Sequence, residues 1–259
     1  MCFDHDAHPP IEPISGAAFS SGRLVLTSED GTEFLAYAAA AGVPGSPAVV
    51  VMPDVRGLFP FYEELADRFA ERGFDAVAID YFGRTAGLDE RVEGFDFWPH
   101  VEQTTQAGIT ADVAVAVSHL RSGPGNENRP VFTIGFCFGG SSSWLQAVGG
   151  HGLSGVIGFY GHPTSAWEGF SSPADAATDF ECPVLGLLGG ADTSISPSDI
   201  SAFDAALNAA GVPHELHTYE GAPHSFFDRA AAEYASASAD AWERVLGFIE
   251  ANRSVGAGL

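Results

Sequence analysis

Val131-Phe-Thr-Ile-Gly-Phe-Cys-Phe-Gly-Gly140 is the stretch of sequence that decides the fold. The apolar run 131–134 predicts a strand buried on both faces, and a helix is expected from about 139 to 148. Cys137 then lies in a sharp turn between strand and helix, with a strained backbone. Such a turn needs small residues two positions to either side, and Gly135 and Gly139 supply them. The pattern predicts a nucleophile elbow with cysteine as nucleophile; the alternative is a buried structural cysteine beside a glycine-rich turn.

Strands and helices alternate on both sides of this turn. We expect further strands at 23–28, 34–40, 48–52, 76–79, 155–160, 184–188 and 215–219, and helices at 61–72, at 105–120, between the last two strands, and up to about 251. The helix between the last two strands has a clear start, with Ser196 as N-cap, Pro197 first and Asp199 third. This alternation predicts the α/β class, a mostly parallel sheet with helices on both faces. We expect an irregular arm over residues 1–22 and a single domain over 23–259.

Composition excludes several kinds of partner. The chain has 11 basic residues, all of them arginine, against 34 acidic ones, and a net charge of −23. Such a charge repels phosphate backbones, so we expect no nucleic-acid partner. No apolar stretch is long enough to span a bilayer and no signal peptide is evident, so we expect a soluble protein without membrane contact. The three cysteines show no metal-ligand or disulfide spacing, which favours a reducing, cytoplasmic location without a bound metal.

Two further residues complete a candidate catalytic set. Asp192 follows the buried strand 184–188, and His224 lies in the loop after the last strand. Catalytic groups gather at the carboxyl ends of parallel strands, so Cys137, Asp192 and His224 are expected at one sheet edge. Their order along the chain is nucleophile, acid and histidine. His224 would accept the thiol proton and return it to the leaving group, and Asp192 would hold the imidazole. Taken alone, the acid or the histidine would be an ordinary loop residue.

Such chemistry needs donors for the negative oxygen of the tetrahedral intermediate. The backbone N–H of Phe138, which follows the nucleophile at a helix N-terminus, is one candidate. The second is the N–H of Val55, in the loop after the strand 48–52. Tyr160, at the end of the strand 155–160, is a candidate for contact with substrate.

The chain resembles the dienelactone hydrolase family, of the α/β-hydrolase fold, from about residue 24 to 250. Four segments carry the likeness: 53–57, Pro-Asp-Val-Arg-Gly; 80–84, Asp-Tyr-Phe-Gly-Arg; 135–140, Gly-Phe-Cys-Phe-Gly-Gly; and 221–226, Gly-Ala-Pro-His-Ser-Phe. The cysteine in the elbow is the specific feature, because most α/β-hydrolases use serine there. The resemblance implies hydrolysis of the enol-lactone ring of a small carboxylate-bearing lactone, in the degradation of aromatic compounds, without a cofactor.

The resemblance also assigns supporting residues. A carboxylate that helps to release the thiolate corresponds to Asp54, where well-known members have glutamate. An arginine that pairs with the substrate carboxylate corresponds to Arg84, and the planar guanidinium suits that task. A second family arginine follows the histidine, but Asp228 occupies its place and Arg229 comes one residue later. Arg56, in the loop of Val55, is an alternative.

Three functions remain open on the sequence alone. The leading hypothesis is a lactone or ester hydrolase that acts through an acyl-enzyme intermediate. A general carboxylesterase or thioesterase of the same fold is the second. The third is a binding protein that has kept the fold without the activity, against which the presence of all three catalytic residues speaks. The natural substrate and the oligomeric state stay undetermined, because a fold does not settle them.

Overall fold

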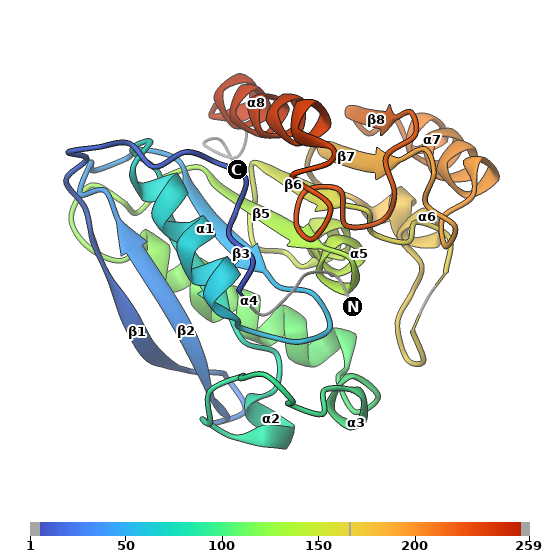
Figure 1. Cartoon of the computed structure of the whole chain (residues 1–259). Helices are drawn as coiled ribbons and strands as arrows, with labels where there is room; N and C mark the ends of the chain where they lie inside the picture. The colour runs from blue at the N-terminus through green and yellow to red at the C-terminus, as the bar shows by residue number, and fades with distance from the viewer. Residues whose placement is uncertain (1–5, 166, 255–259) are drawn as a thin grey trace.

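The computed structural model describes residues 6–165 and 167–254, and in them one eight-stranded sheet (Figure 1). The strands are β1 (Ser20–Thr27), β2 (Glu33–Ala40), β3 (Ala48–Met52), β4 (Asp75–Ile79), β5 (Val131–Phe136), β6 (Gly155–Phe159), β7 (Val184–Gly189) and β8 (His214–Tyr219). Their order is β1-β2-β4-β3-β5-β6-β7-β8. β2 runs antiparallel to both β1 and β4, and all other neighbours are parallel. The predicted, mostly parallel sheet is confirmed.

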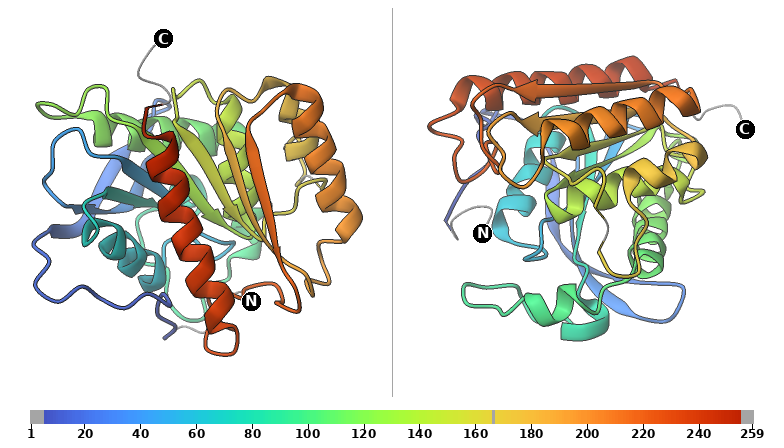
Figure 2. Two further views of the ribbon diagram at one scale, coloured as in Figure 1. Left: turned by 90° about the horizontal axis from the view of Figure 1, so that it is seen from above. Right: turned by 90° about the vertical axis from the view of Figure 1, so that its right-hand side faces the viewer.

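Helices cover both faces of this sheet. They are α1 (Pro60–Ala70), α2 (Gly83–Ala86), α3 (Trp98–Val101), α4 (Gln106–Arg121), α5 (Phe138–Leu145), α6 (Pro173–Ala176), α7 (Pro197–Ala210) and α8 (Ala235–Asn252), with short 3₁₀ turns at Gln146–Val148 and Ala177–Asp179. Figures 1 and 2 show α1 and α8 on one face and α4, α5 and α7 on the other. Ring contacts join the helices within each layer: Phe69 of α1 meets Trp242 of α8, and Trp144 of α5 meets Phe203 of α7.

The central strands are buried on both faces, as their continuous apolar sequences predict. Every residue of β3, β5, β6 and β7 is buried, as apolar runs must be when helices cover both faces. At the start of α7 the side chain of Ser196 accepts from the N–H of Asp199, and the Asp199 side chain accepts from the N–H of Ser196. The predicted helix start is therefore confirmed.

The sequence missed some local features. β1 begins at Ser20, so the last residues of the predicted arm pair with β2. The four-residue helices α2, α3 and α6 were not predicted, because a single helical turn is too short for a periodic pattern. The helix after the elbow ends at Leu145 and continues as a 3₁₀ turn to Val148. Residues 1–5 of the arm lie outside the described residues. No helix in the described part of the chain is long and apolar enough to cross a bilayer.

Candidate active site

Cys137 stands at the turn between β5 and α5 with a backbone that few residues adopt. Its φ is 55° and its ψ is −113°, outside the usual regions for a residue with a side chain. The flanking glycines allow this turn. A Cβ on Gly135 would lie 1.8 Å from the carbonyl oxygen of Gly139, and one on Gly139 would lie 2.2 Å from the carbonyl oxygen of Met52. Neither position can hold a larger residue, so this part of the chain has the geometry expected of an elbow.

Asp192 and His224 meet although 32 positions separate them along the chain. His224 Nδ1 lies 2.6 Å from Asp192 Oδ2, and the N–H and hydroxyl of Ser194 donate to Asp192 Oδ1 at 2.8 and 2.6 Å. Burial would raise the pKa of Asp192, but the hydrogen bonds from His224 and Ser194 outweigh it, so the pKa lies below its ordinary value. The carboxylate is therefore held ionised against the imidazole. With Nδ1 engaged in this way, Nε2 is the ring nitrogen that proton transfer would use.

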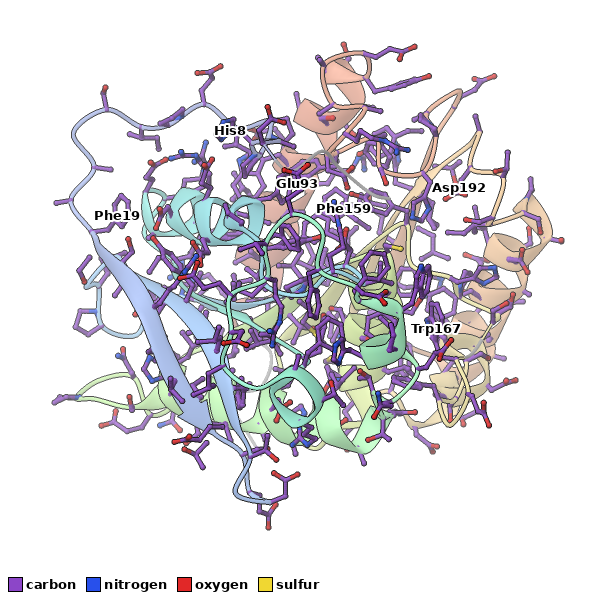
Figure 3. All side chains as sticks on the ribbon, turned by 60° about the horizontal axis from the view of Figure 1, so that its bottom comes forward. His8, Phe19, Glu93, Phe159, Trp167 and Asp192 are labelled. Atoms are coloured by element: carbon purple, nitrogen blue, oxygen red, sulfur yellow. The ribbon has the colours of Figure 1, made fainter. Side chains whose placement is uncertain are left out.

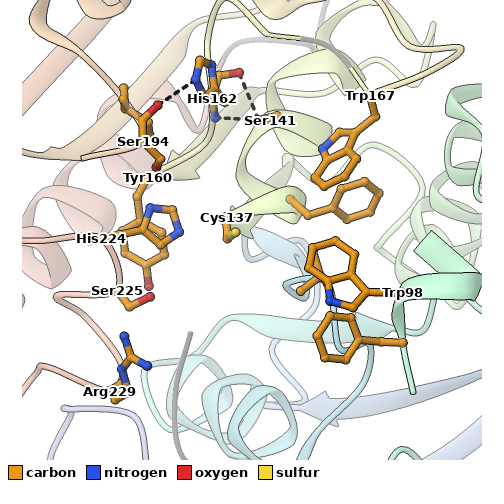
Figure 4. Close-up of a pocket in the computed structure, with 14 residues that line it drawn as sticks. Trp98, Cys137, Ser141, Tyr160, His162, Trp167, Ser194, His224, Ser225 and Arg229 are labelled. Atoms are coloured by element: carbon orange, nitrogen blue, oxygen red, sulfur yellow. Dashed lines mark hydrogen bonds between the residues drawn. The ribbon is translucent and has the colours of Figure 1, made fainter. Parts of the chain in front are cut away.

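Cys137 and His224 open into a common pocket of about 370 Å³ (Figure 4). The residues that line it are mostly aromatic or small: Val55, Phe97, Trp98, Cys137, Phe138, Ser141, Tyr160, His162, Trp167, Ser194, Ile195, His224, Ser225 and Arg229. No aspartate or glutamate is among them, although the chain carries 34 acidic residues. An acid-free lining in so acidic a protein favours a neutral or anionic ligand.

Two backbone N–H groups at this pocket have no hydrogen-bond acceptor among the described residues. Val55 and Phe138 both line the pocket and are almost fully buried. Within the described residues, neither N–H donates a hydrogen bond to another group of the protein. Buried N–H groups are nearly always paired, so two unused donors beside Cys137 mark a position for an acceptor from outside the chain. They are the two groups that the sequence predicted for an oxyanion hole.

Arg84 does not reach the pocket, contrary to the role that the resemblance implied. Its guanidinium contacts Asp112, Asp30 and Ser28, at 2.6, 2.9 and 3.0 Å. Asp112 is buried, and a buried carboxylate needs a cationic partner. The structure therefore gives Arg84 a structural position, joining α2 to α4 and to the turn between β1 and β2.

Asp54 and Arg56 are likewise paired with each other. Arg56 Nη2 lies 2.8 Å from Asp54 Oδ2, and the backbone N–H of Arg56 donates to Asp54 Oδ1. Both are buried and neither lines the pocket. No hydrogen bond joins Asp54 to Cys137 in the described part of the chain, so its position does not support the expected contact with the thiol. The shorter aspartate is instead held by its own loop.

Arg229, by contrast, lines the pocket. Ten of the eleven arginines use their guanidinium groups in hydrogen bonds or ion pairs with other parts of the chain: Arg23, Arg56, Arg68, Arg72, Arg84, Arg91, Arg121, Arg129, Arg244 and Arg253. The guanidinium of Arg229 makes no such contact within residues 6–165 and 167–254. In Figure 4 it points into the pocket from the side of His224 and Ser225.

Tyr160 also lines the pocket, but its hydroxyl has a partner. It donates to Asp228 Oδ2 at 2.6 Å, and its ring lies 4.9 Å from that of His224. Asp228 is buried, and burial raises its pKa to about 7 despite the hydrogen bonds from Tyr160 and from the N–H of Arg229. The residue that stands in place of the family's second arginine is therefore a buried acid that orients Tyr160.

Several pocket residues were missed by sequence reasoning. Ser225, next to His224, has φ of 64° and a buried hydroxyl without a partner among the described residues. Trp98 lies in the single helical turn α3, and Trp167 lies in the segment between β6 and α6. Neither segment has a periodic pattern, so the sequence did not mark them. His162 links the pocket to the loop that carries Asp192, because its Nε2 lies 2.9 Å from the carbonyl oxygen of Ser194 in that loop. Within the described residues, no group of three or more His, Cys, Asp or Glu side chains could hold a metal ion.

Comparison with known proteins places this chain in a family. The model of the dienelactone hydrolase family matches residues 34–252. A Synechocystis relative, provisionally named carboxymethylenebutenolidase, is 31% identical over 208 residues, 77% of this chain and 83% of its own. The carboxymethylenebutenolidase of Rhodococcus opacus is 28% identical over 272 residues, 99% of each chain.

Solved structures agree with these relatives. A crystal structure from Klebsiella pneumoniae, provisionally named a dienelactone hydrolase, has a TM-score of 0.79 at 27% identity and covers 90% of this chain and 99% of its own. An acylaminoacyl peptidase from Pyrococcus horikoshii, with a TM-score of 0.71 at 15% identity, covers 91% of this chain and 42% of its own and shares the fold alone. The chain is therefore a hydrolase of the α/β-hydrolase fold and belongs to the dienelactone hydrolase family.

Proposed function

We propose that the protein opens the ester bond of a small carboxylate-bearing lactone or ester, with Cys137 as nucleophile. The observation that carries this proposal is the convergence of Cys137 and His224 on one pocket, with Asp192 bound to the imidazole at 2.6 Å. A cysteine with a purely structural role would need neither a strained backbone nor a histidine at the same pocket that is hydrogen-bonded to an aspartate. The family membership supports the reaction class.

The reaction follows from the positions of these groups. His224 Nε2 takes the proton of the Cys137 thiol, and the thiolate attacks the carbonyl carbon. The carbonyl oxygen becomes an anion and accepts from the N–H groups of Val55 and Phe138. The ester C–O bond then breaks, and the leaving oxygen takes the proton from His224, which leaves a thioester on Cys137. Water attacks the thioester and gives a proton to His224, which returns it to the sulfur as the carboxylic acid leaves.

Substrate charge is the second part of the proposal. Arg229 supplies a guanidinium without a protein partner among the described residues, and the Ser225 hydroxyl is buried and unpartnered there. A substrate carboxylate at this side of the pocket would satisfy both groups, and among the described residues no acidic side chain lines the pocket to repel it. Arg229 therefore takes the role that the resemblance had implied for Arg84. Tyr160 shapes the same side with its ring.

A panel of substrates tests this proposal. Purified wild type, Cys137→Ala and Cys182→Ala are compared on a dienelactone, a simple neutral lactone, an aryl ester and a thioester. We expect turnover of the anionic lactone by wild type and Cys182→Ala, and none by folded Cys137→Ala. A folded Cys137→Ala variant that retains turnover would overturn the mechanism. A preference for neutral esters or thioesters would favour the carboxylesterase or thioesterase alternative, and no turnover on any substrate would favour a binding protein.

The remaining features of the proposal follow from composition and chemistry. The residues named supply every proton transfer, so we propose that no cofactor is needed. We also propose a cytoplasmic location and no nucleic-acid partner, from the free thiols and the net charge of −23.

A further inference from the structure

The side chain of His162 uses both of its ring nitrogens in hydrogen bonds to the protein. Its Nδ1 accepts from the backbone N–H of Ser165 at 3.1 Å, and its Nε2 lies 2.9 Å from the carbonyl oxygen of Ser194. A carbonyl oxygen can only accept, so Nε2 must carry a proton, whereas a nitrogen that accepts from an N–H carries none. The two partners therefore select one form of the ring, the neutral tautomer with its proton on Nε2.

The backbone of His162 is held by the helix that follows Cys137. The N–H of His162 donates to Ser141 Oγ at 2.7 Å, and that hydroxyl donates to the carbonyl oxygen of His162 at 3.1 Å. Ser141 lies in α5, and its own N–H donates to the carbonyl oxygen of Cys137 at 3.2 Å. The two segments pack closely, because a Cβ on Gly161 would lie 2.5 Å from the backbone nitrogen of Ser141. His162 is therefore fixed to the element that carries the thiol.

Ser194 connects the ring of His162 to Asp192. The N–H and hydroxyl of Ser194 both donate to Asp192 Oδ1, and Asp192 Oδ2 lies 2.6 Å from His224 Nδ1. His162 holds the remaining polar group of Ser194, its carbonyl oxygen. Figure 4 shows His162 with its bonds to Ser141 and Ser194 at the edge of the pocket. One series of hydrogen bonds thus runs from α5 through His162 to the imidazole of His224.

We propose that His162 is a positioning residue, which holds Ser194 in place so that Asp192 stays directed at His224. A carboxylate bound through one oxygen alone can rotate, and the bonds from Ser194 to the second oxygen prevent this. A ring that only filled space in the pocket wall would not need a defined tautomer. The inference rests on the proposed function and adds to it a residue that acts through the acid rather than on the substrate.

Two amide variants separate the two bonds of the ring. In His162→Gln the amide N–H can reach the position of Nε2 and donate to Ser194, whereas in His162→Asn the shorter amide reaches only the position of Nδ1 and can accept from Ser165. His162→Phe removes both bonds. His214→Phe is the matched control, because both ring nitrogens of His214 also have partners in the protein and the residue does not line the pocket.

Kinetics on p-nitrophenyl acetate give the first readout. We expect kcat to fall roughly ten- to hundredfold in His162→Asn and His162→Phe, the scale known for outer partners that orient the ligands of a metal site, with KM changed by less than about threefold. His162→Gln should recover most of this loss, and His214→Phe should match wild type. Circular dichroism checks folding, and if His162→Phe does not fold, the asparagine and glutamine variants decide.

Proton NMR gives a second readout that does not depend on turnover. The proton between His224 Nδ1 and Asp192 Oδ2, in a bond of 2.6 Å, should resonate far downfield and is identified by its loss in His224→Ala. We expect it to be retained in wild type, His162→Gln and His214→Phe, and to be shifted upfield or lost by exchange with water in His162→Asn and His162→Phe.

The two readouts separate failure of this inference from failure of the proposed function. Equal kcat and an equal resonance in His162→Asn and His162→Gln would overturn the inference and leave the Cys137 mechanism intact, as would the same losses in His214→Phe. If wild type hydrolyses no ester, the proposed function fails and the resonance decides alone. Its loss in His162→Asn with retention in His162→Gln would then support the positioning role, and no difference between them would exclude it.

Discussion

The hydroxyl of Tyr160 donates to Asp228 Oδ2 at 2.6 Å, and both side chains are buried. Tyr160 has a positive φ of 37° at the end of β6, and its ring contacts His224. The buried acid therefore fixes a strained residue of the pocket wall. Figure 3 draws the side chains that fill the molecule between its strands and helices. The ring of Tyr160 contacts those of Phe136, Phe159 and Phe226, so Tyr160 can move only if these neighbours move.

Asp228 should make stability depend on pH. Burial raises its pKa from 3.8 to about 7, so the protonated form is favoured in the folded state. The contribution of protonated Asp228 to the free energy of unfolding is therefore present in full below pH 4 and is lost as pH rises through 7. A pKa raised from 3.8 to about 7 corresponds to about 4 kcal/mol. Asp228→Asn cannot ionise, so its free energy of unfolding, relative to wild type, should rise by several kcal/mol from pH 4 to 8. Denaturant titrations at both pH values measure this, and a constant difference between the two proteins would contradict it.

Iodoacetamide should label Cys137 in preference to Cys182. Cys137 lines the pocket, whereas burial raises the pKa of the Cys182 thiol to about 12. The thiolate is the reactive form, so Cys182 should stay unmodified in the folded protein. Peptide mass spectrometry on a Cys2→Ala background measures the order of labelling, because Cys2 lies outside the described residues. Labelling of Cys137 should slow in His224→Ala. Modification of Cys182 first would contradict the assignment.

Arg229→Gln should weaken anionic substrates selectively. The variant removes the cation at the pocket while leaving Cys137 and His224 in place. Because Arg229 is exposed, the loss should be about 1–2 kcal/mol, or roughly five- to thirtyfold in kcat/KM, below that for a fully buried charge pair. A neutral ester such as p-nitrophenyl acetate should change less than twofold. Equal losses on both substrates would remove Arg229 from substrate recognition, and rescue by Arg229→Lys would support a role for charge.

Arg84→Ala should lower stability rather than alter substrate choice. The variant would leave the buried carboxylate of Asp112 without its cation, at a cost of roughly 2–4 kcal/mol, because Arg84 is only partly buried. Burial already raises the pKa of Asp112 despite the bond from Arg84. The double variant Arg84→Ala/Asp112→Asn should recover part of the loss. Unfolding measurements on the three proteins test this, and a selective loss of activity on anionic lactones would instead restore the role implied by resemblance.

Asp192→Asn should lower kcat without unfolding the protein. Asparagine can present an N–H to His224 Nδ1, which would favour the wrong imidazole tautomer. In a serine triad the same change costs about 10⁴-fold in kcat, and we expect a loss of similar order here. Pre-steady-state kinetics should place the loss in acyl-enzyme formation. An activity within tenfold of wild type would show that His224 does not depend on Asp192. Ser194→Ala, which removes one of several bonds to the same carboxylate, should cost far less.

The sequence by itself determined the architecture and the candidate catalytic residues. Strands β3, β5, β6 and β7 are buried on both faces, so their residues do not alternate between apolar and polar. Continuous apolar runs of this length therefore predicted these strands. Gly135 and Gly139 flank Cys137 because the turn leaves no space for a Cβ, which is a local requirement. Asp192 and His224 follow strand ends, and parallel strands bring such positions to one edge.

Only the tertiary structure decided which arginine faces the pocket. Arg84 forms an ion pair with Asp112, 28 positions away, and Arg56 forms one with Asp54. No periodic pattern in the sequence predicts either pair. The two tryptophans of the pocket were equally hidden, because Trp98, at the start of α3, and Trp167, between β6 and α6, come from opposite sides of β5 along the chain. Strand and turn preferences act between neighbours in sequence, whereas charge pairing and ring contacts depend on distances that exist only after the chain has folded.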